Sequence, residues 1–469
     1  MQPRKITNVG LYEMISVEPI GLTMVAGALS EEGYPVYLED FVNTQNVQRY
    51  IEQYKPDICG LSCSFTSDQG MVKEIARKIK AHASHTLVFI GGHHASMYPQ
   101  GLADDSIDAV VLGEGEITVK ELVQAYKENE DLSRVPGLFL NHQDQGWMYT
   151  GTRPLIQNLD NLPFPRRDLL TKYKDKYFIG LKKSVFTLET GRGCPHKCKF
   201  CSVWKFFHKK YRMKSPERVV EEIKKIPGDA ILITDDNFFS NYERAEKIGK
   251  MLESEGIKKY FNVQARSDDV VKHPELIRLW RRLGLSSVFI GFEQIDEAGL
   301  EKLGKNNSVI NNEKAHNLLR ELGVRVISSF IVDPGYTRGD FQAMIDYIKK
   351  KSIDTPAFSV LTPLPGTELY RELKQDLQVQ NFDLYDLLHA VLPTTLSLET
   401  FYQEFANLWK AVYKKQKMKE ISWEAVKEFI TKPEMWVHSV KLLSKINALY
   451  KVENYLKDHW RIGDHRIMQ

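Results

Sequence analysis

The stretch GRGCPHKCKFCS (residues 191–202) holds three of the five cysteines of a 469-residue chain. Cys194, Cys198 and Cys201 have the spacing C-x3-C-x2-C, and no fourth cysteine lies nearby in the sequence to complete a set. A structural zinc site normally has four protein ligands, whereas three ligands leave one coordination position open for chemistry. The spacing therefore predicts a metal site with one open position, and the rest of the chain must indicate what occupies it.

The overall composition is that of an ordinary globular protein. Apolar residues make up 42% of the chain and charged residues 27%, and the formal net charge is +3. This balance gives no reason to expect a nucleic-acid partner. The N-terminal segment lacks the apolar region of a secretory signal, and no run of about 18 apolar residues occurs that would span a bilayer. We therefore expect a cytoplasmic protein whose clustered cysteines bind metal or act in catalysis rather than form disulfides.

Residues 1–130 alternate between strand-like and helix-like segments. The predicted strands are 57–65, 86–92 and 108–116, and the predicted helices are 21–34, 69–83 and 117–129. Such alternation is typical of βαβ units that build a parallel sheet. Open α/β sheets bind ligands in the loops at the carboxyl ends of their strands. We therefore expect the first 150 residues to form a Rossmann-like ligand-binding domain.

The rest of the chain divides into three predicted parts. Residues 151–183 have no clean periodicity and several prolines, so they are predicted to be an ordered connector. Residues 184–375 contain about six further strand–helix repeats, which predict a partial (β/α)6 barrel. Residues 376–469 have helical periodicity alone, with helices expected at 401–419 and 435–456. The predicted fold class is therefore α/β with a helical C-terminal region.

The cysteine loop follows the first strand of the predicted barrel, and in this setting it resembles the radical S-adenosylmethionine superfamily. In that family three cysteines bind a 4Fe–4S cluster, and S-adenosylmethionine chelates the remaining iron and yields a 5′-deoxyadenosyl radical. Thiolates are soft ligands suited to such clusters. The resemblance implies that Cys194, Cys198 and Cys201 bind the cluster. The alternative is a zinc site completed by His196 or His208.

Motifs after later strands share this likeness, namely TDDNFF at 234–239 and GFEQ at 291–294. The resemblance implies that S-adenosylmethionine is held by Asp235, Asp236 and Asn237 at its amino group and by Glu293 at its ribose, with Arg266 as a candidate partner for its carboxylate. The acidic and amide side chains can accept hydrogen bonds from an ammonium or a ribose hydroxyl, and the planar guanidinium of arginine can pair with a carboxylate. The alternative for each acidic residue is a helix cap or a surface ion pair.

Three segments of the N-terminal domain, ICGLSCSFTSD, VFIGGHHAS and VVLGEGE, resemble the cobalamin-binding domain that precedes the barrel in one large subgroup of the superfamily. The resemblance assigns cobalamin binding to Ser64, Thr66, Gly91, Gly92, His94, Gly113, Glu114 and Gly115. Glycine permits close backbone approach to a large ligand. His93 is an additional histidine beside the one that the subgroup carries.

One departure from the cobalamin-binding pattern concerns the first loop. Domains that ligate cobalt from below carry D-x-H-x-x-G there, whereas residues 11–21 of this chain, LYEMISVEPIG, contain no histidine. We therefore expect no histidine ligand to cobalt from this loop. The alternative is a Rossmann-like domain that has lost the cofactor or binds another nucleotide. Cys59 and Cys63 lie in an apolar strand and are expected to be buried packing residues.

The combination of cobalamin, S-adenosylmethionine and a 4Fe–4S cluster implies a radical methyltransferase that uses methylcobalamin to methylate an unactivated carbon. Two alternatives stay open: an oxidative cyclase or ring-forming enzyme without net methyl transfer, and a non-catalytic cobalamin-binding sensor. An electron donor such as flavodoxin or ferredoxin is also expected. The sequence identifies no side chain as a general acid or base.

The C-terminal region gives a prediction about the substrate. Residues 384–413 resemble the C-terminal part of the hopanoid C-3 methylases, which implies an apolar lipid substrate. Residues 401–469 carry an excess of Lys and Arg beside aromatic residues, and basic amphipathic helices can lie at an anionic membrane surface. The aromatic residues concerned are Trp409, Tyr413, Trp423 and Trp436. The alternative is that they pack on the barrel, and His389 either lines the substrate cavity or is structural.

Overall fold

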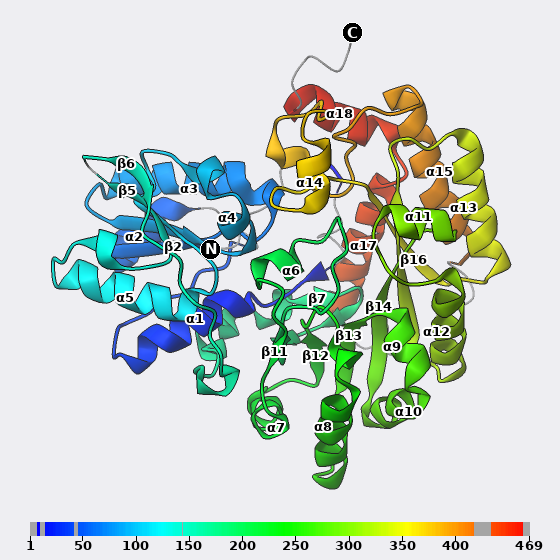
Figure 1. Ribbon diagram of the computed structural model, residues 1–469, viewed down its shortest axis with the longest axis horizontal. Coiled ribbons are helices and arrows are strands. Elements are labelled where there is room, and N and C mark those ends of the chain that lie inside the picture. The colour runs from blue at the N-terminus through cyan, green and yellow to red at the C-terminus, as the bar shows by residue number, and fades with distance from the viewer. Residues whose placement is uncertain (1–6, 10–14, 42–45, 143, 417–432, 463–469) are drawn as a thin grey trace.

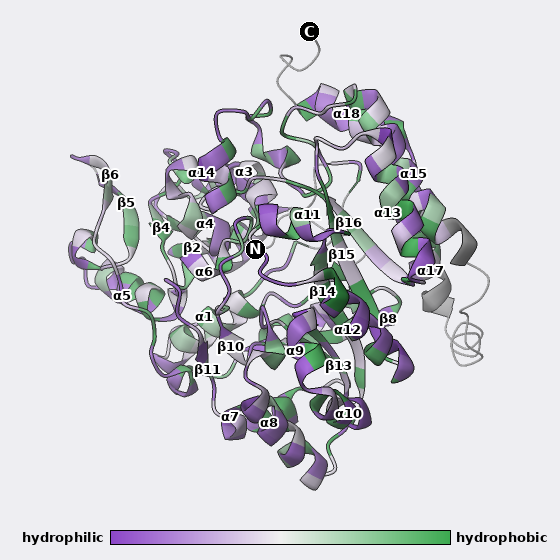
Figure 2. Cartoon of the chain, turned by 45° about the vertical axis from the view of Figure 1, so that its right-hand side comes forward, coloured by the Kyte–Doolittle hydropathy of each residue, from purple (hydrophilic) through white to green (hydrophobic). Residues whose placement is uncertain are grey.

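The computed structural model describes residues 7–9, 15–41, 46–142, 144–416 and 433–462. Two large sheets with their covering helices lie side by side, and helices of the C-terminal region pack beside the second of them (Figure 1). Hydrophobic residues concentrate along the strands, whereas the outward faces of the surrounding helices are hydrophilic (Figure 2). This separation is what burial of apolar surface requires.

The N-terminal sheet has five strands in the order in which they occur along the chain. These strands are β2 (Ile58–Ser62), β3 (Leu87–Gly91), β4 (Ala109–Val111), β5 (Leu138–His142) and β6 (Gly146–Tyr149). Strands β2, β3 and β4 are parallel, as predicted, whereas β5 and β6 form an antiparallel hairpin added at the β4 edge. The loops that follow β2, β3 and β4 consequently meet at one edge of the sheet.

Helices cover both faces of this sheet. They are α1 (Ile20–Glu31), α2 (Val47–Tyr54), α3 (Gln69–His82) and α5 (Gly115–Lys127), with the short α4 (His93–Met97) at the carboxyl end of β3. Alternate residues of the strands pack into two separate apolar clusters, one with α2 and α3 and the other with α5. Cys59 and Cys63 lie in the first of these clusters, so both are buried packing residues, as the sequence predicts.

The second sheet has six parallel strands and forms a partial barrel. The strands are β9 (Val185–Leu188), β12 (Ala230–Ile233), β13 (Tyr260–Ala265), β14 (Leu285–Glu293), β15 (Arg325–Val332) and β16 (Thr355–Val360). Outer helices include α7 (Pro216–Lys225), α8 (Tyr242–Ser254), α10 (Pro274–Leu283), α12 (Val309–Glu321) and α13 (Arg338–Lys350). Ser215 caps α7 by accepting a hydrogen bond from the backbone N–H of Arg218, and Pro216 occupies its first turn. This barrel therefore confirms the predicted fold class.

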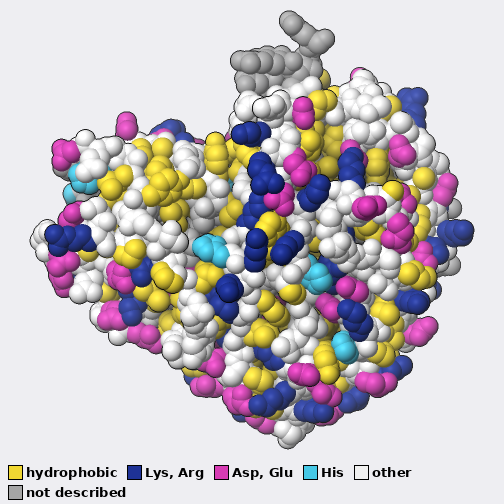
Figure 3. Space-filling view, in the orientation of Figure 1, with side chains coloured by type: hydrophobic (Ala, Val, Ile, Leu, Met, Phe, Trp, Pro, Cys, Tyr) yellow, Lys and Arg dark blue, Asp and Glu magenta, His cyan; other side chains and the backbone are white. Residues whose placement is uncertain are grey.

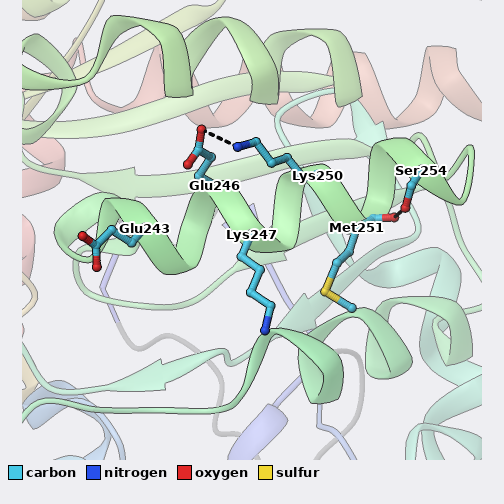
Figure 4. A pocket seen from close by; sticks show the side chains of 6 residues that line it. All are labelled: Glu243, Glu246, Lys247, Lys250, Met251 and Ser254. Atoms are coloured by element: carbon cyan, nitrogen blue, oxygen red, sulfur yellow. Dashed lines mark hydrogen bonds and ion pairs between the residues drawn. The ribbon is translucent and has the colours of Figure 1, made fainter.

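A hollow on the outer surface runs along α8, far along the chain from the cysteines (Figure 4). Its charged side chains pair with neighbours: Lys250 contacts Glu246 on the same helix, and Lys247 contacts Glu217 of α7 at 2.7 Å. Helix α8 covers the outside of the barrel, whereas barrels carry their chemistry at the carboxyl ends of the strands. We therefore assign this hollow no part in the functional site.

The C-terminal region consists of α15 (Leu398–Gln416), α17 (Pro433–Ala448) and α18 (Val452–Ile462). The single helix expected at 435–456 is thus two helices, and the last three residues of the one expected at 401–419 lie outside the described residues. Trp409 is buried in the barrel core, and Tyr413 packs against that core. For these two aromatic residues the packing alternative holds, whereas Trp423 and the side chain of Trp436 lie outside the described residues.

His389 is fully buried and belongs to a polar cluster rather than to an open cavity. Its Nδ1 lies 2.9 Å from a carboxylate oxygen of Asp386, and its Nε2 lies 3.5 Å from one of Asp458. Asn8, near the start of the chain, donates two hydrogen bonds of 2.6 Å to Asp458 in α18. The cluster therefore joins the two ends of the chain, and His389 is structural. None of the helices in the described ranges is long and apolar enough to cross a membrane.

Candidate functional site

The cysteine loop is closed at its base by a short two-stranded ribbon. Strand β10 (Gly191–Arg192) pairs antiparallel with β11 (Arg212–Met213), directly after β9 of the barrel. The loop between them contains the three cysteines and the short helix α6 (Val203–Phe206). Gly193 has a φ of +91°, and a Cβ there would lie 2.2 Å from the carbonyl oxygen of Lys210. Only glycine therefore allows the ribbon to close.

The three cysteine thiols lie inside this loop. Cys198 is buried, and Cys194 and Cys201 are half-buried. Burial raises the pKa of Cys194 to about 11 and that of Cys201 to about 12, with the charge of Asp236 acting in the same direction. Because a metal binds the thiolate form, cluster binding must displace these protons. Such displacement is ordinary for soft iron–sulfur ligation.

The zinc alternative has no counterpart in the described part of the chain. Nowhere in it do three His, Cys, Asp or Glu side chains converge on a position that could hold a single metal ion. His208 is exposed and His196 is half-buried. Cysteines that bind an iron–sulfur cube each bind a different iron, so their sulfurs need not converge on one point. The donor set of three soft thiols in one loop thus fits a cluster better than a single zinc ion.

Two of the three predicted polar residues after β12 hold neighbouring loops together. The carboxylate of Asp235 accepts hydrogen bonds from the backbone N–H of Thr190, at 2.7 Å, and from its hydroxyl. Asn237 donates to Asp269 at 2.7 Å and accepts from the backbone N–H of Arg266 at 3.1 Å. Both side chains are buried. They therefore shape the site but offer few free hydrogen-bonding groups to a ligand.

Asp236 differs from these two neighbours because its side chain is exposed. Protein atoms still surround it on most sides, and this desolvation, followed by the charges of Asp235 and Glu189, raises the pKa of Asp236 to about 7. Its charge acts on the thiols of Cys194 and Cys201. Of the predicted trio, Asp236 is consequently the side chain best placed to meet a ligand beside the cysteines.

Arg266 has partners other than the one predicted for it. Its guanidinium donates to the backbone carbonyl of Lys305 at 3.1 Å, to that of Asn306 at 2.8 Å and to Asp268 at 3.0 Å. The side chain is buried, with 5% of its surface exposed. Its fork is therefore occupied by acceptors of the chain itself, and the structure does not present it to a ligand carboxylate. Its charge nevertheless acts on Cys194 and Cys198.

Glu293 ends β14 in an unusual conformation. Its φ is +63°, a region that non-glycine residues rarely adopt, and its carboxylate accepts a hydrogen bond of 2.6 Å from the Lys305 ammonium. A Cβ at Gly291 would lie 1.9 Å from this carboxylate, which explains the glycine of the GFEQ motif. The charges of Lys305 and Glu293 both act on Cys198. The structure thus brings Glu293 close to the cysteine loop, and its contact with a ribose stays a prediction.

The loops predicted to bind cobalamin lie together at the carboxyl edge of the N-terminal sheet. Ser64 follows β2, Gly91 and Gly92 end β3, and Gly113 follows β4. Gly113 has a φ of +72°, and a Cβ there would meet no atom within 4 Å, so this turn faces open space. A Cβ at Gly92, by contrast, would lie 2.8 Å from the carbonyl oxygen of Cys63. Packing of two loops therefore explains Gly92, and Gly113 is the turn that a large ligand can approach.

Thr66 and His94 are buried rather than presented at this edge. Both ring nitrogens of His94 have hydrogen-bond partners: Thr66 Oγ1 lies 3.1 Å from His94 Nδ1, and Gln69 Oε1 lies 3.0 Å from His94 Nε2. Phe382 of the C-terminal region packs its ring edge-on against His94. Burial lowers the pKa of His94 to about 4, so the imidazole is neutral. Both residues support the loop from inside.

The last two predicted cobalamin residues lie at the start of α5. Gly115 is the first residue of that helix and packs close to Val25 of α1. The Glu114 carboxylate points toward the cysteine loop, where it accepts hydrogen bonds from Arg192 at 2.7 Å and from Arg212 at 2.9 Å. Its side chain is therefore engaged across the two domains, and only its backbone is left for the predicted contact with cobalamin.

Sequence reasoning assigned no role to several residues that lie at the cysteine loop. His93 Nε2 lies 2.6 Å from the hydroxyl of Ser202, directly after Cys201, and its ring stacks on Phe206 at 4.5 Å between centroids. Arg192, Arg212 and Lys305 were also missed. The doubled histidine of GGHH and the arginine inside GRGC were the available signals, but nothing local identified their partners.

Comparisons with known proteins identify the two domains. Residues 188–348 match the Radical SAM superfamily, and residues 16–123 match the B12 binding domain. The hopanoid C-3 methylase of Methylococcus capsulatus is 31% identical over 96% of this chain and 86% of its own length. An uncharacterized methyltransferase of Pyrococcus horikoshii is 31% identical over 75% of this chain and 77% of its own.

Solved structures share the whole architecture. The radical S-adenosylmethionine methyltransferase TsrM of Kitasatospora setae superposes with a TM-score of 0.70 at 18% identity, over 92% of this chain and 97% of that one. The cobalamin-dependent radical enzyme OxsB superposes with a TM-score of 0.69 at 16% identity, over 96% of this chain and 79% of that one. At these identities the likeness concerns the fold.

The six-stranded barrel with its three-cysteine loop, preceded by a B12-binding domain, defines a class of enzyme with two cofactor domains. The chain belongs to the cobalamin-binding radical S-adenosylmethionine enzymes. It is a methyltransferase that acts on an unactivated carbon, with a 4Fe–4S cluster, S-adenosylmethionine and cobalamin as its cofactors. These predictions are confirmed, and the cyclase and sensor alternatives receive no better support. As a member of this superfamily it also requires a reductant.

Proposed function

We propose that the chain methylates an unactivated carbon of an apolar polycyclic lipid of the hopanoid class. The observation that carries the methyl-transfer part of this proposal is the direct contact between the cysteine loop and the loop after β3, through His93 and Ser202 at 2.6 Å. The two cofactor-binding edges therefore face each other. The relative that acts on hopanoids covers nearly the whole chain, including the C-terminal region.

The same proposal assigns the binding residues. Cys194, Cys198 and Cys201 hold the cluster, Asp236 and Glu293 hold S-adenosylmethionine, and the loops with Ser64, Gly91 and Gly113 hold cobalamin. When bound, these groups supply a radical that removes a hydrogen atom from carbon and a methyl group that replaces it. The chain itself places the binding loops opposite each other and keeps polar side chains beside the cysteines largely satisfied.

A buried apolar cluster lies beside the cysteine loop in the region proposed to face the substrate. Leu303, Ile331, Leu361 and Leu369 are buried together, and Phe200 of the cysteine loop packs against them. The backbone also ties these elements together, because Lys199 donates its N–H to the carbonyl of Leu303 and Leu369 donates to that of Lys199, both at 3.0 Å. On this side the cysteine loop is thus backed by apolar packing.

An anaerobic assay with the reconstituted protein and a hopanoid tests the function. We expect S-adenosylhomocysteine and 5′-deoxyadenosine to form in proportion to methylated product, which is identified by mass. Lipid extracts of cells with and without the protein should differ by the same added methyl group. 5′-Deoxyadenosine without S-adenosylhomocysteine would instead indicate the cyclase class. Neither product, with cobalamin bound, would indicate the sensor.

The proposal includes a docking site for a flavodoxin or ferredoxin as the electron donor. Residues 197–210 contain five lysines and no Asp or Glu, and Lys197, Lys209 and Lys210 are exposed. Basic side chains gather near the middle of the face on which the two domains meet (Figure 3). An acidic donor protein would be steered toward this loop, and electrons would enter close to the cysteines.

The double variant Lys209→Glu/Lys210→Glu tests this docking site. We expect it to raise the KM for reduced flavodoxin by about tenfold or more, because like charges then face each other across the contact. Activity driven by dithionite should stay unchanged. The matched control is Lys349→Glu/Lys350→Glu at the exposed end of α13. Equal effects of the two double variants would contradict docking at the cysteine loop.

Peripheral membrane contact completes the proposal. Helix α17 exposes Val440 and Leu443, with 61% and 43% of their surfaces accessible, beside the exposed Lys441. Apolar side chains with flanking lysines favour an anionic membrane surface. We expect the protein to co-sediment with vesicles that contain anionic lipid but not with neutral vesicles. Equal amounts of sedimented protein with and without anionic vesicles would contradict membrane contact.

A further inference from the structure

A cluster of buried charges lies between the cobalamin-binding domain and the base of the cysteine loop. Arg192 and Arg212 come from the two strands of the ribbon, and Glu114 and Glu116 come from the start of α5. Between 5% and 8% of the surface of each of these four residues is exposed. Charged side chains are almost never buried to this degree unless they are paired.

The two arginines of this group of buried charges donate oriented hydrogen bonds to the glutamates. Arg212 forms a two-pronged contact with Glu114, at 2.9 and 3.0 Å, and Arg192 donates to Glu114 at 2.7 Å and also to Glu116. The remaining nitrogen donor of Arg192, Nε, binds Glu189 at 2.8 Å. Arg192 and Arg212 are direct partners in the register of the ribbon. The Glu114 carboxylate of the first domain therefore accepts hydrogen bonds from both strands that close the cysteine loop.

The pKa values of Glu114 and Arg192 are consistent with the paired contacts that these side chains make. Burial alone would raise the pKa of Glu114, but the hydrogen bond from Arg212 and the charge of Arg192 outweigh it and hold this pKa below its usual range. Burial would lower the pKa of Arg192, but Glu116 and Glu189 hold it well above the ordinary value. Their mutual contacts therefore favour the ionised forms of Glu114 and Arg192 despite burial.

Stability alone does not explain such a cluster. Replacing a buried ion pair by well-packed apolar side chains is often neutral or stabilising, because desolvation offsets most of the Coulombic attraction. What forked arginine–carboxylate contacts add is a fixed relative orientation of the groups that carry them. Here those groups are the turn after β4, next to the open Gly113, and the residues directly before Cys194.

A second contact fixes the same loop at its other side. His93 binds Ser202, the residue after Cys201, and stacks on Phe206 of α6. Burial lowers the pKa of His93 to about 4, so this contact is made by a neutral ring. The cysteine loop is thus held to the first domain both before its first cysteine and after its last one.

We propose that four positioning residues fix the cysteine loop relative to the turn after β4, namely Arg192, Arg212, Glu114 and Glu116. They thereby also fix the distance between the 4Fe–4S cluster and cobalamin. The inference rests on the binding sites proposed above, but it concerns a contact within the chain. Methyl transfer needs the two cofactors to serve one substrate carbon. Small errors in placement reduce the rate strongly even when each cofactor is fully bound.

The test compares Glu114→Gln and the conservative Arg212→Lys with a matched control, Glu121→Gln. Glu121 lies on the same helix and pairs with Arg153, at 3.1 Å, without reaching the cysteine loop. Hydrogen–deuterium exchange of residues 193–211 is measured first in protein without cofactors. In reconstituted protein, the magnetic dipolar coupling between the reduced cluster and cob(II)alamin is then measured, together with kcat and KM.

We expect Glu114→Gln and Arg212→Lys to make the amides of residues 193–211 exchange faster. Both variants should also show a broadened dipolar coupling, with unchanged iron and cobalamin contents. The kcat should fall about tenfold to a hundredfold with little change in the KM for S-adenosylmethionine. Glu121→Gln should match the wild type. If Glu114→Gln and Arg212→Lys match it as well in exchange and coupling, the positioning role is overturned. Absence of methylation by the wild type would instead overturn the proposed function, while the exchange data would still decide the positioning role.

Discussion

We expect Cys198→Ala to abolish 5′-deoxyadenosine formation and methylation, and to lower the iron content well below the wild-type value of about four per chain. Cys198 is buried at the centre of the cysteine loop, where its backbone carbonyl accepts a hydrogen bond of 3.0 Å from the Trp204 indole. Alanine keeps this backbone contact and removes only the sulfur. Iron and sulfide analysis with the anaerobic assay measures the effect.

The matched control for this prediction is Cys59→Ala. Cys59 lies in β2 among apolar side chains, and burial raises its pKa to about 11, so it is an inert thiol in the absence of a metal. Its loss removes one small buried group, at a cost of about 1 kcal/mol. Full iron content and activity are expected. A Cys198→Ala protein that loses iron but methylates at the wild-type rate would refute the radical mechanism.

Much of the fold could be predicted because parallel strands buried on both faces appear as short apolar runs. The segments 57–65, 86–92 and 108–116 contain β2, β3 and β4, and about six repeats were expected where the barrel has six strands. The hairpin of β5 and β6 was missed, since antiparallel strands added at an edge break the β/α alternation on which the prediction relied.

The residues of the candidate site could be predicted where a local motif determines the chemistry. They could not be predicted where a distant segment of the chain supplies the hydrogen-bond partner. The cysteine spacing and the glycine before Glu293 are local. Arg266, by contrast, was expected to meet a ligand, but two carbonyls about 40 residues further along the chain occupy its guanidinium. The contact between Arg192 and Glu114 joins residues 78 positions apart. No periodicity or spacing in a single sequence identifies such pairs.

The second large effect concerns Lys305, and we expect Lys305→Met to lower both stability and affinity for S-adenosylmethionine. Lys305 and Glu293 form a pair at 2.6 Å whose side chains are 9% and 7% exposed. Removing the ammonium leaves a buried carboxylate without its counter-ion, which costs about 3–5 kcal/mol. The carboxylate is then no longer held in place, and its proposed contact with the ribose weakens by about tenfold or more in Kd.

Lys302→Met is the control, because the chain offers a nearly identical pair at the surface three residues away. Lys302 contacts Asp333 at 2.7 Å, but these side chains are 70% and 22% exposed. Exposed pairs contribute less than about 1 kcal/mol, since water solvates both partners after the change. Thermal unfolding and equilibrium binding of S-adenosylmethionine to the reconstituted protein are measured for both variants.

Comparison of the two lysine variants separates the effect of losing a buried ion pair from the effect of losing one positive charge. Both variants remove one positive charge from the same segment, so any effect of net charge on S-adenosylmethionine binding is shared. Lys305→Arg should retain most of the stability because it keeps a cation beside Glu293. Gly291→Ala should reproduce the loss of affinity from the other side, since its Cβ would lie 1.9 Å from the Glu293 carboxylate. Equal melting temperatures and equal Kd values for Lys305→Met and Lys302→Met would show that Glu293 does not depend on its buried partner.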